Sequence, residues 1–267
     1  MTAREFENAV VLITGGGTGM GAAFAVELAR EGAAVAVCGR RPEPIAAVAE
    51  ECRGLGVRAL ATSVDVRDPA AVEAWVAEVA AGLGTPTHLI NNAAGNFLCP
   101  AIDLSPNGWR SVIEIVLNGT FYCSSSVAKC MRDGGHGGVI LNVIASYAWT
   151  GNPLTAHSAA AKAGVLNLAK TLAVEWAPYG IRVNCVAPGP LDTAGAASAL
   201  FPTPEVREKM IDEIPAGRFT RLEDVVEAAR FLLSDRSSYI TGDCITVDGG
   251  QSLSKGMFRH TPLSPRR

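Results

Sequence analysis

The sequence has little charge and few aromatic side chains. Charged residues make up 18% of its 267 residues and aromatic residues 6%, whereas hydrophobic residues make up 48%. A disordered chain has more charge and less apolar surface than this, so we expect a globular protein with a large core. Acidic and basic residues nearly balance, at a net charge of −3, so the strongly basic surface of a nucleic-acid-binding protein is missing. We therefore expect no nucleic-acid partner.

Long apolar runs are also absent. Glycine or polar residues interrupt them well before the roughly 20 residues that a membrane span needs. The first residues lack the apolar segment of a secretion signal, and the last four are Ser-Pro-Arg-Arg, not a peroxisomal Ser-Lys-Leu ending. We expect a cytoplasmic protein that has no membrane partner.

The seven cysteines form no Cys-x-x-Cys motif. Cys123 and Cys130 are seven residues apart, but no histidine pair completes a zinc site. We interpret the cysteines as small buried residues in a reducing compartment, and we predict no metal site.

A glycine-rich segment, TGGGTGMG at 14–21, lies near the start of the chain. The β-branched run Val10 to Ile13 precedes it, a helix to about Arg30 follows, and a second strand is expected from Ala33 to Cys38. Glycine lets backbone approach a phosphate, and a helix start offers free amide donors. This arrangement predicts a dinucleotide site. The predicted contacts are Gly15, Gly17, Thr18, Gly19, Met20 and Gly21.

Two arginines, Arg40 and Arg41, follow the second predicted strand. An acidic residue there would accept hydrogen bonds from the 2′-hydroxyl of NAD, whereas guanidinium groups match a 2′-phosphate. The alternative is a solvated charge pair at the start of the next helix. We predict NADP(H) as the cofactor.

The rest of the chain alternates helices and strands. Helices are predicted at about 42–55, 70–83, 105–131, 155–177 and 222–234, and strands at 58–66, 88–91, 139–145, 181–187 and 244–247. This order predicts an α/β fold, a Rossmann-type doubly wound parallel sheet of seven strands with helices on both faces, in a single domain over 1–267. Residues 192–215 are expected to form a mobile cover over a substrate, and 251–267 a polar tail.

Residues after the strands face the ligand crevice in such sheets. Asp65 is expected near the adenine end of the cofactor. Ala93 leaves the backbone bare beside the cofactor, and Asn96 is a side-chain donor. The sequence also predicts a rigid turn that can cover the nicotinamide, formed by Pro188, Gly189, Pro190 and Leu191.

Two polar residues lie on predicted helices that are otherwise apolar. Asn118 needs partners there, so it either satisfies a kink or belongs to a proton network. Lys162 is costly to bury unless it binds something. Tyr147 follows the preceding strand, from where its phenol can reach the same crevice.

Together these motifs resemble the short-chain dehydrogenase/reductase family over nearly the whole chain. The matching residues are Thr-Gly-x-x-x-Gly-x-Gly at 14–21, Asn91-Asn92-Ala93-Ala94-Gly95, Asn118, Lys162, Pro188-Gly189 and Asp248-Gly249-Gly250. Ordinary members carry a Tyr-x-x-x-Lys motif with a serine about thirteen residues before the tyrosine. Here Ser158 occupies the tyrosine's position and Ala145 that of the serine, so the nearest phenol is Tyr147.

One branch of the family, the 2,4-dienoyl-CoA reductases, lacks the usual tyrosine in the same way, and this sequence resembles that branch. Its motifs are matched by NNAAGNF at 91–97, LSPN at 104–107, IVLNGT at 115–120, and Tyr147 with Ser158 and Lys162. The resemblance implies hydride transfer from NADPH to a dienoyl-CoA, with Tyr147 and Asn96 donating hydrogen bonds to the thioester oxygen, and a 3-enoyl-CoA as product in the β-oxidation of unsaturated fatty acids.

The same resemblance implies that Lys162 binds the nicotinamide ribose and that the protein is a homotetramer. Catalytic roles are expected for Asn118 and Ser158 as well. Expected substrate contacts are Arg40, Arg67, Phe97, Ser105 and Ser158. An arginine that the branch can carry in the cover has no counterpart here, where Ala199 precedes Leu200.

Other interpretations remain open at this point. Tyr147 alone is typical of a half-buried packing residue, Ser158 of a small filler and Asn96 of a turn cap. The chain can also be a reductase of another enoyl-CoA or of a carbonyl, or an NADP-binding protein without catalysis. Only the joint occurrence of these residues with Lys162 favours the reductase of dienoyl-CoA.

Overall fold

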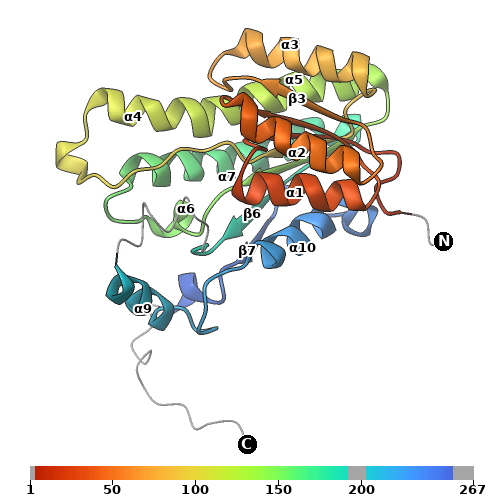
Figure 1. The fold of residues 1–267 in the computed structure, drawn as a ribbon. Helices are drawn as coiled ribbons and strands as arrows, with labels where there is room; N and C mark the ends of the chain where they lie inside the picture. The colour runs from red at the N-terminus through yellow and green to blue at the C-terminus, as the bar shows by residue number, and fades with distance from the viewer. Residues whose placement is uncertain (1–3, 192–202, 255–267) are drawn as a thin grey trace, which may run out of the picture.

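A parallel sheet runs through the computed structural model, which describes residues 4–191 and 203–254 (Figure 1). Its seven strands lie in the order β3-β2-β1-β4-β5-β6-β7, and all neighbours are parallel. The strands are β1 (Val10–Thr14), β2 (Ala34–Gly39), β3 (Ala59–Ser63), β4 (His88–Asn91), β5 (Gly138–Val143), β6 (Ile181–Pro188) and β7 (Cys244–Val247). The predicted Rossmann-type sheet is confirmed.

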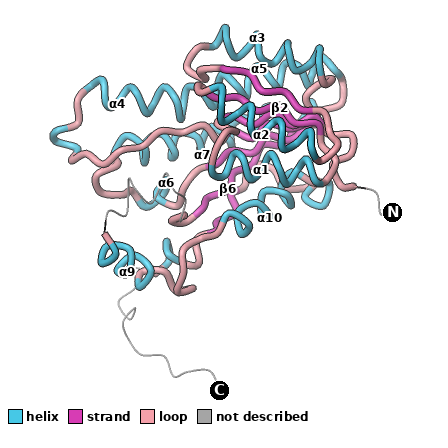
Figure 2. The backbone as a smooth tube through the Cα atoms, viewed as in Figure 1, coloured by secondary structure: helices cyan, strands magenta, loops and turns pink. Residues whose placement is uncertain are grey.

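Helices cover both faces of this sheet (Figures 1 and 2). Helices α1 (Gly19–Arg30), α2 (Pro42–Gly54) and α10 (Leu222–Leu233) pack on one face, and α3 (Pro69–Gly82), α5 (Gly119–Gly134) and α7 (Ala156–Trp176) on the other. Each face has its own apolar core, because the strands are buried on both sides and alternate side chains point into each layer.

Several helices start at a sequence-encoded position. The residue before α3, Asp68, accepts hydrogen bonds from the backbone N–H groups of Ala70 and Ala71. Proline fixes a helical φ where no N–H is needed, and it begins α2, α3, α4 (Pro106–Ile113) and α9 (Pro204–Asp212). These starts place the strand-to-helix loops at the carboxyl edge of the sheet.

The structure differs from several of the predicted elements. Strand β3 ends at Ser63 instead of 66. The predicted helix at 105–131 is divided by a π-helical segment, Glu114–Asn118, between α4 and α5. The short helix α6 (Tyr147–Thr150) was not predicted, because four residues show no helical periodicity.

Two further predictions lie partly outside the described residues. The predicted cover at 192–215 includes α9, and its residues 192–202 lie outside the described ranges. Of the predicted tail, Gln251–Leu253 forms a 3₁₀ turn, and 255–267 lie outside. None of the helices within the described ranges is long and apolar enough to cross a membrane.

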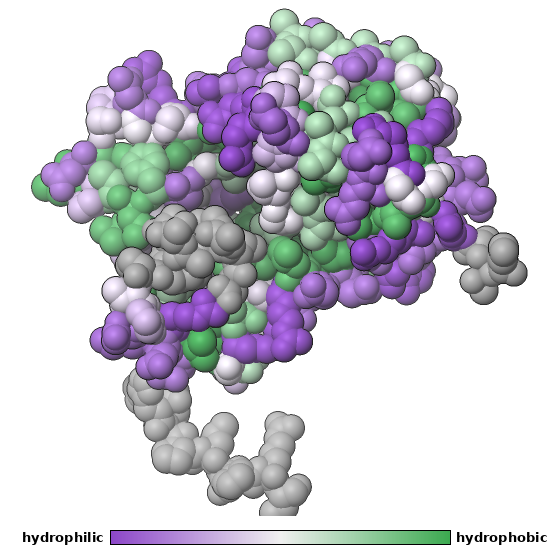
Figure 3. Space-filling view, viewed as in Figure 1, coloured by the Kyte–Doolittle hydropathy of each residue, from purple (hydrophilic) through white to green (hydrophobic). Residues whose placement is uncertain are grey.

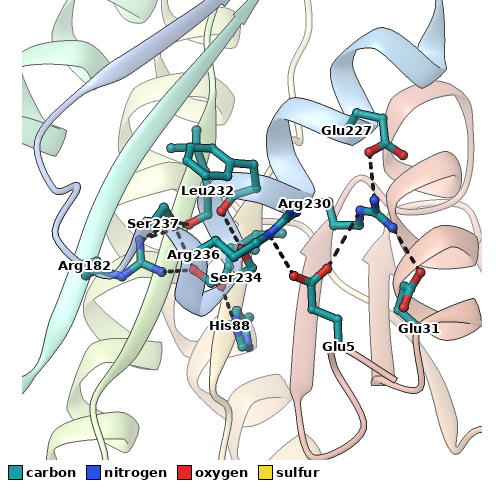
Figure 4. A network of polar contacts seen from close by, with 12 residues as sticks. Glu5, Glu31, His88, Arg182, Glu227, Arg230, Leu232, Ser234, Arg236 and Ser237 are labelled. Atoms are coloured by element: carbon teal, nitrogen blue, oxygen red, sulfur yellow. Dashed lines mark hydrogen bonds and ion pairs between the residues drawn. The ribbon is translucent and has the colours of Figure 1, made fainter. Parts of the chain in front are cut away.

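The amino edge of the sheet is closed by a polar network (Figure 4). The guanidinium of Arg182 donates to the carbonyls of Leu232, Ser234 and Ile240 and to the Ser237 hydroxyl, at 3.0–3.3 Å. Next to it, the Arg230 guanidinium pairs with three carboxylates, those of Glu5, Glu31 and Glu227. This network joins α10 to the chain start, α1 and β6.

Candidate active site

A cleft of about 480 Å³ opens at the carboxyl edge of the sheet. It is lined by seven of the predicted cofactor contacts, namely Gly15, Gly17, Thr18, Met20, Arg40, Asp65 and Ala93. Four further lining residues were not predicted as cofactor contacts: Val64, Val66, Asn92 and Ile115, of which the last two belong to the family motifs. A larger hollow, about 930 Å³, lies beside Gly32 and Gly84 at the amino edge, away from these residues. We take the carboxyl-edge cleft as the cofactor site because the predicted cofactor contacts gather there; its lining does not include Tyr147, Asn96 or Lys162.

The glycine-rich turn is folded tightly against the loop after β4. A side chain at Gly21 would have its Cβ 2.2 Å from the Gly15 carbonyl oxygen, and Gly15 itself has a φ of +64°. The Asn92 amide donates to the carbonyls of Thr14 and Gly15, at 3.0 and 3.1 Å. The turn therefore needs glycine at these positions, and it leaves bare backbone and the start of α1 at the cleft, as a phosphate group requires.

The charged residues of the cleft lie at its β2–β3 end. Arg40 and Arg41 are exposed and line the cleft. Asp65 accepts hydrogen bonds from the Arg67 guanidinium Nε at 2.9 Å, and this hydrogen bond is the main reason why the pKa of Asp65 is lowered. The predicted adenine contact and a predicted substrate contact thus pair with each other.

Tyr147 begins helix α6 and lies half-buried at the mouth of the sheet. Its hydroxyl is 3.1 Å from the Ser158 hydroxyl on α7. Burial raises the pKa of the phenol above its usual 10, so it stays protonated at neutral pH and is available as a hydrogen-bond donor. The structure therefore brings together two residues that are eleven positions apart in the sequence.

Lys162 lies one helical turn after Ser158 and is 7% exposed. Its ammonium donates a hydrogen bond to the carbonyl of Val143, the last residue of β5. Burial lowers the pKa of Lys162 to about 8. A cation at the carboxyl edge, close to the strand that precedes Tyr147, is thus held by the sheet itself.

Asn118 ends the π-helical segment, and its amide donates to the Glu114 carboxylate at 2.8 Å. A π-helical turn leaves backbone groups out of the regular pattern. This geometry agrees with the interpretation that Asn118 satisfies a helix irregularity. Its role in a proton network stays a prediction.

Asn96 lies in the irregular connection between β4 and α4. Its side-chain oxygen accepts the Phe97 N–H at 3.0 Å, and the residue is exposed. The Ser105 hydroxyl caps α4 by accepting the Gly108 N–H at 3.1 Å. A Cβ at Gly108 would lie 3.2 Å from the Phe97 ring and 3.3 Å from that hydroxyl, so the two predicted substrate contacts, Phe97 and Ser105, flank the same glycine.

Apolar side chains reach the surface along this connection. At the left of Figure 3, hydrophobic residues gather near the start of α4. Phe97 is 39%, Leu98 47% and Ile102 93% exposed. An exposed group of this kind is suited to contact an apolar ligand or partner.

The predicted nicotinamide turn follows β6. Gly189 donates its N–H to the Val247 carbonyl at 2.9 Å, and a Cβ there would lie 2.8 Å from the Asp248 Cα. The Pro190 carbonyl accepts the Thr220 N–H at 2.9 Å. The turn is therefore fixed against the end of β7, and its contact with a nicotinamide stays a prediction.

Sequence analysis missed His157, which is fully buried beside Ser158. Its ring packs edge-on against Phe97, with centroids 4.4 Å apart. No local signal could have revealed this contact, because the two residues are 60 positions apart. Across the described ranges, no group of three or more His, Cys, Asp or Glu side chains could hold a metal ion.

A parallel Rossmann-type sheet with this carboxyl-edge cleft defines a nucleotide-binding oxidoreductase fold. A family model described as enoyl-(acyl carrier protein) reductase matches residues 15–252. The chain belongs to the short-chain dehydrogenase/reductase family. Its fold and family imply a nicotinamide nucleotide cofactor, and the bare-backbone turn at Gly15 fits the phosphates of such a group.

Individual relatives are similar over most of their length. A Bacillus subtilis protein named probable 2,4-dienoyl-CoA reductase [(2E)-enoyl-CoA-producing] is 47% identical over 94% of this chain and 100% of its own. A zebrafish (Danio rerio) peroxisomal 2,4-dienoyl-CoA reductase [(3E)-enoyl-CoA-producing] is 39% identical over 92% of this chain and 82% of its own. The crystal structure of a Bacillus anthracis short-chain dehydrogenase superimposes with a TM-score of 0.86 at 44% identity, covering 94% of this chain and 99% of that one.

Proposed function

We propose that the protein is an NADPH-dependent reductase of 2,4-dienoyl-CoA thioesters. The observation that carries the proposal is the contact of the Tyr147 phenol with Ser158, one turn before Lys162. This contact brings a protonated phenol to the helix that lacks the family's usual tyrosine. Relatives named 2,4-dienoyl-CoA reductase support the same substrate class.

The choice of NADPH rests on the β2 end of the cleft. Arg40 and Arg41 are exposed there and can bind a 2′-phosphate with charge-assisted hydrogen bonds. Lys162 would hold the nicotinamide ribose, and the turn at 188–191 would cover the ring. When bound, the reduced cofactor supplies a hydride.

In this mechanism the chain's own residues stabilise charge on the substrate. Hydride addition to a conjugated thioester moves negative charge onto the thioester oxygen. Tyr147 and Asn96 donate hydrogen bonds to that oxygen, and the Lys162 ammonium adds positive potential. Such preorganised donors stabilise a transition state by roughly 3–4 kcal/mol each. Ser158 orients the Tyr147 hydroxyl and contacts the substrate, and Asn118 has a supporting catalytic role.

The proposed product is a 3-enoyl-CoA. The hydride adds to carbon 5, and the resulting dienolate takes a proton from water at carbon 2. Both donors act at the thioester end, next to carbon 2, and the mechanism places no acid at carbon 4. The two relatives named above carry different product names. Proton NMR of the product formed in D₂O distinguishes the two positions, and deuterium at carbon 4 would contradict the 3-enoyl product.

The proposal is tested by following the absorbance of a 2,4-hexadienoyl-CoA solution with NADPH and purified protein. We expect loss of both the dienoyl and the NADPH absorbance. A panel of dienoyl, 2-enoyl and 3-oxoacyl thioesters is measured in parallel. Preference for a 2-enoyl thioester would instead favour the activity that the family model's description names. NADPH binding without any turnover would indicate a non-catalytic protein.

An acyl-CoA is therefore the proposed small-molecule partner. The homotetramer and the cytoplasmic location stay predictions. Size-exclusion chromatography with light scattering measures the first of these directly.

A further inference from the structure

The connection that carries Asn96 has no regular secondary structure of its own from Asn92 to Pro100. The hydrogen bond that Asn96 accepts comes from the next residue, Phe97, so it does not fix the side chain relative to the rest of the site. A donor that stabilises a transition state must nevertheless be held in place before the reaction. Other contacts must therefore hold the loop around Asn96 in place.

The first residues of the connection are tied to the glycine-rich turn. The Thr14 hydroxyl accepts the backbone N–H groups of Asn92 and Ala93, both at 3.0 Å. These bonds end three residues before Asn96. They position the side of the loop that faces the cofactor cleft.

The far side of the connection is tied to the segment that leads into α7. The Cys99 N–H donates to the Leu154 carbonyl at 2.8 Å. Leu154 has a φ of +64° and is the one non-glycine residue with positive φ in the described part of the chain. The second contact comes from the Phe97 ring, which packs edge-on against the His157 ring with the ring centroids 4.4 Å apart.

His157 is built into the first turn of α7. It is fully buried, and its Nδ1 accepts the Ser158 N–H at 2.7 Å. Burial lowers the pKa of His157 below 6.5, so the ring is neutral at pH 7. Its Nε2 is buried with no hydrogen-bond partner in the described structure. His157 therefore contacts the loop through its aromatic ring and not through a hydrogen bond of Nε2.

Two neighbouring residues of α7 thus contact one proposed donor, Tyr147, and the neighbour of the other, Asn96. Ser158 contacts the Tyr147 hydroxyl, and His157 contacts the residue after Asn96. We propose that His157 is a positioning residue that clamps Phe97 and so holds Asn96 in register with Tyr147. The inference rests on the proposed function, because it gives Asn96 a partner in catalysis, but the clamp itself can be tested without turnover.

The first experiment is a double-mutant cycle on kcat with the preferred thioester of the panel. We expect His157→Ala to lower kcat roughly tenfold to a hundredfold through misplacement of Asn96, with the Kd for NADPH unchanged. Asn96→Ala should lose as much or more, and the double variant should lose no more than Asn96→Ala alone. His157→Phe keeps the ring, and its kcat should return to within about threefold of the original protein.

Losses that multiply in the double variant would overturn the clamp, because His157 would then act independently of Asn96. Failure of His157→Phe to restore kcat, with the fold intact by circular dichroism, would overturn the ring contact as the cause. Absence of turnover in the original protein would instead count against the proposed function alone.

The second experiment measures the accessibility of the loop directly. Cys99 is partly exposed within it, so its alkylation by iodoacetamide, followed by mass spectrometry, reports how firmly the loop is held. We expect severalfold faster alkylation of Cys99 in His157→Ala and in Phe97→Ala, whose exposed ring can be removed without harm to the core. Cys130 on α5 is the matched control and should react at an unchanged rate. Equal Cys99 rates in all three proteins would overturn the proposal.

Discussion

At the amino edge of the sheet, the guanidinium groups of Arg182 and Arg230 are surrounded by protein acceptors, whereas at the carboxyl edge Arg40, Arg41 and Asn96 are exposed. Both edges carry cations of the same type on the same sheet. Their difference lies in whether the chain itself supplies the partners.

This difference separates stability from function. At the amino edge the hydrogen bonds connect elements distant in sequence, such as β6 and α10, so removing a donor leaves acceptors unsatisfied. At the carboxyl edge Arg40 and Arg41 are exposed, and the Asn96 side chain accepts its hydrogen bond through the oxygen, which leaves its N–H donors available to a ligand. We therefore expect changes at the amino edge to alter the free energy of unfolding, and changes at the carboxyl edge to alter kinetics.

The largest effect is expected for Tyr147→Phe. Loss of a donor that serves the transition state should lower kcat by roughly a hundredfold or more. The melting temperature should change little, because the ring is retained. Tyr179→Phe, at an exposed position, is the matched control and should keep full activity. An unchanged kcat in Tyr147→Phe would mean that Tyr147 contributes to packing and not to catalysis.

Arg182→Met tests the other edge. Its guanidinium bonds to three carbonyls and a hydroxyl, so its loss should lower the free energy of unfolding by roughly 2–3 kcal/mol, measured by urea denaturation. At low urea, kcat should be unchanged. For comparison, Arg236→Met removes a more exposed ion pair and should cost less than about 1 kcal/mol. A large loss of kcat in folded Arg182→Met would break the division between the edges.

Replacing both Arg40 and Arg41 by alanine should weaken NADPH specifically. We expect KM for NADPH to rise roughly tenfold to a hundredfold, because charge-assisted hydrogen bonds to a phosphate are lost, while KM for NADH stays nearly constant. Steady-state kinetics with each cofactor measure this. Arg53→Ala, an exposed arginine near the end of α2, serves as the control. Equal weakening of both cofactors would mean that the arginines bind a part common to both.

A smaller effect is expected from pH. The pKa of Lys162 is lowered to about 8, so its charge is present below pH 8 and is lost above it. Because kcat/KM reports on the free enzyme, kcat/KM for NADPH should fall about tenfold per pH unit above pH 8. The phenol of Tyr147 titrates higher, since burial raises its pKa. Lys170→Gln on the solvent side of α7 should leave the profile unchanged, and a flat profile to pH 9.5 would contradict the role of Lys162.

Much of the fold could be predicted from the sequence because its strands are short apolar runs bounded by glycine, proline or polar residues. The alternation of strands with helices predicted the doubly wound parallel sheet with helices on both faces. Strand β3 ends earlier than its apolar pattern indicates. Val64 and Val66 are as buried as strand residues, but the adjacent strand β2 ends at Gly39, whose carbonyl accepts the Val64 N–H at 3.1 Å, and the pairing stops there. An apolar pattern reports burial and not hydrogen-bond pairing.

The site was harder to predict, because its geometry depends on contacts between distant residues. The glycine-rich turn carries its own signal, since Gly21 leaves no room for a side chain. The pairing of Asp65 with Arg67 could not be foreseen, because each residue alone was suited to a ligand. The clamp between Phe97 and His157 is invisible to any local pattern. The π-helical turn before Asn118 is likewise hidden, because one added residue hardly alters an apolar periodicity.

The hydrogen bond from Lys162 to the Val143 carbonyl has a thermodynamic consequence. A free lysine side chain loses up to about 2 kcal/mol of rotamer entropy when it is immobilised. Here that loss is incurred when the protein folds, so docking of a ribose would not incur it again. If Lys162 binds the nicotinamide ribose as proposed, this ordering of its ammonium strengthens the affinity for the cofactor.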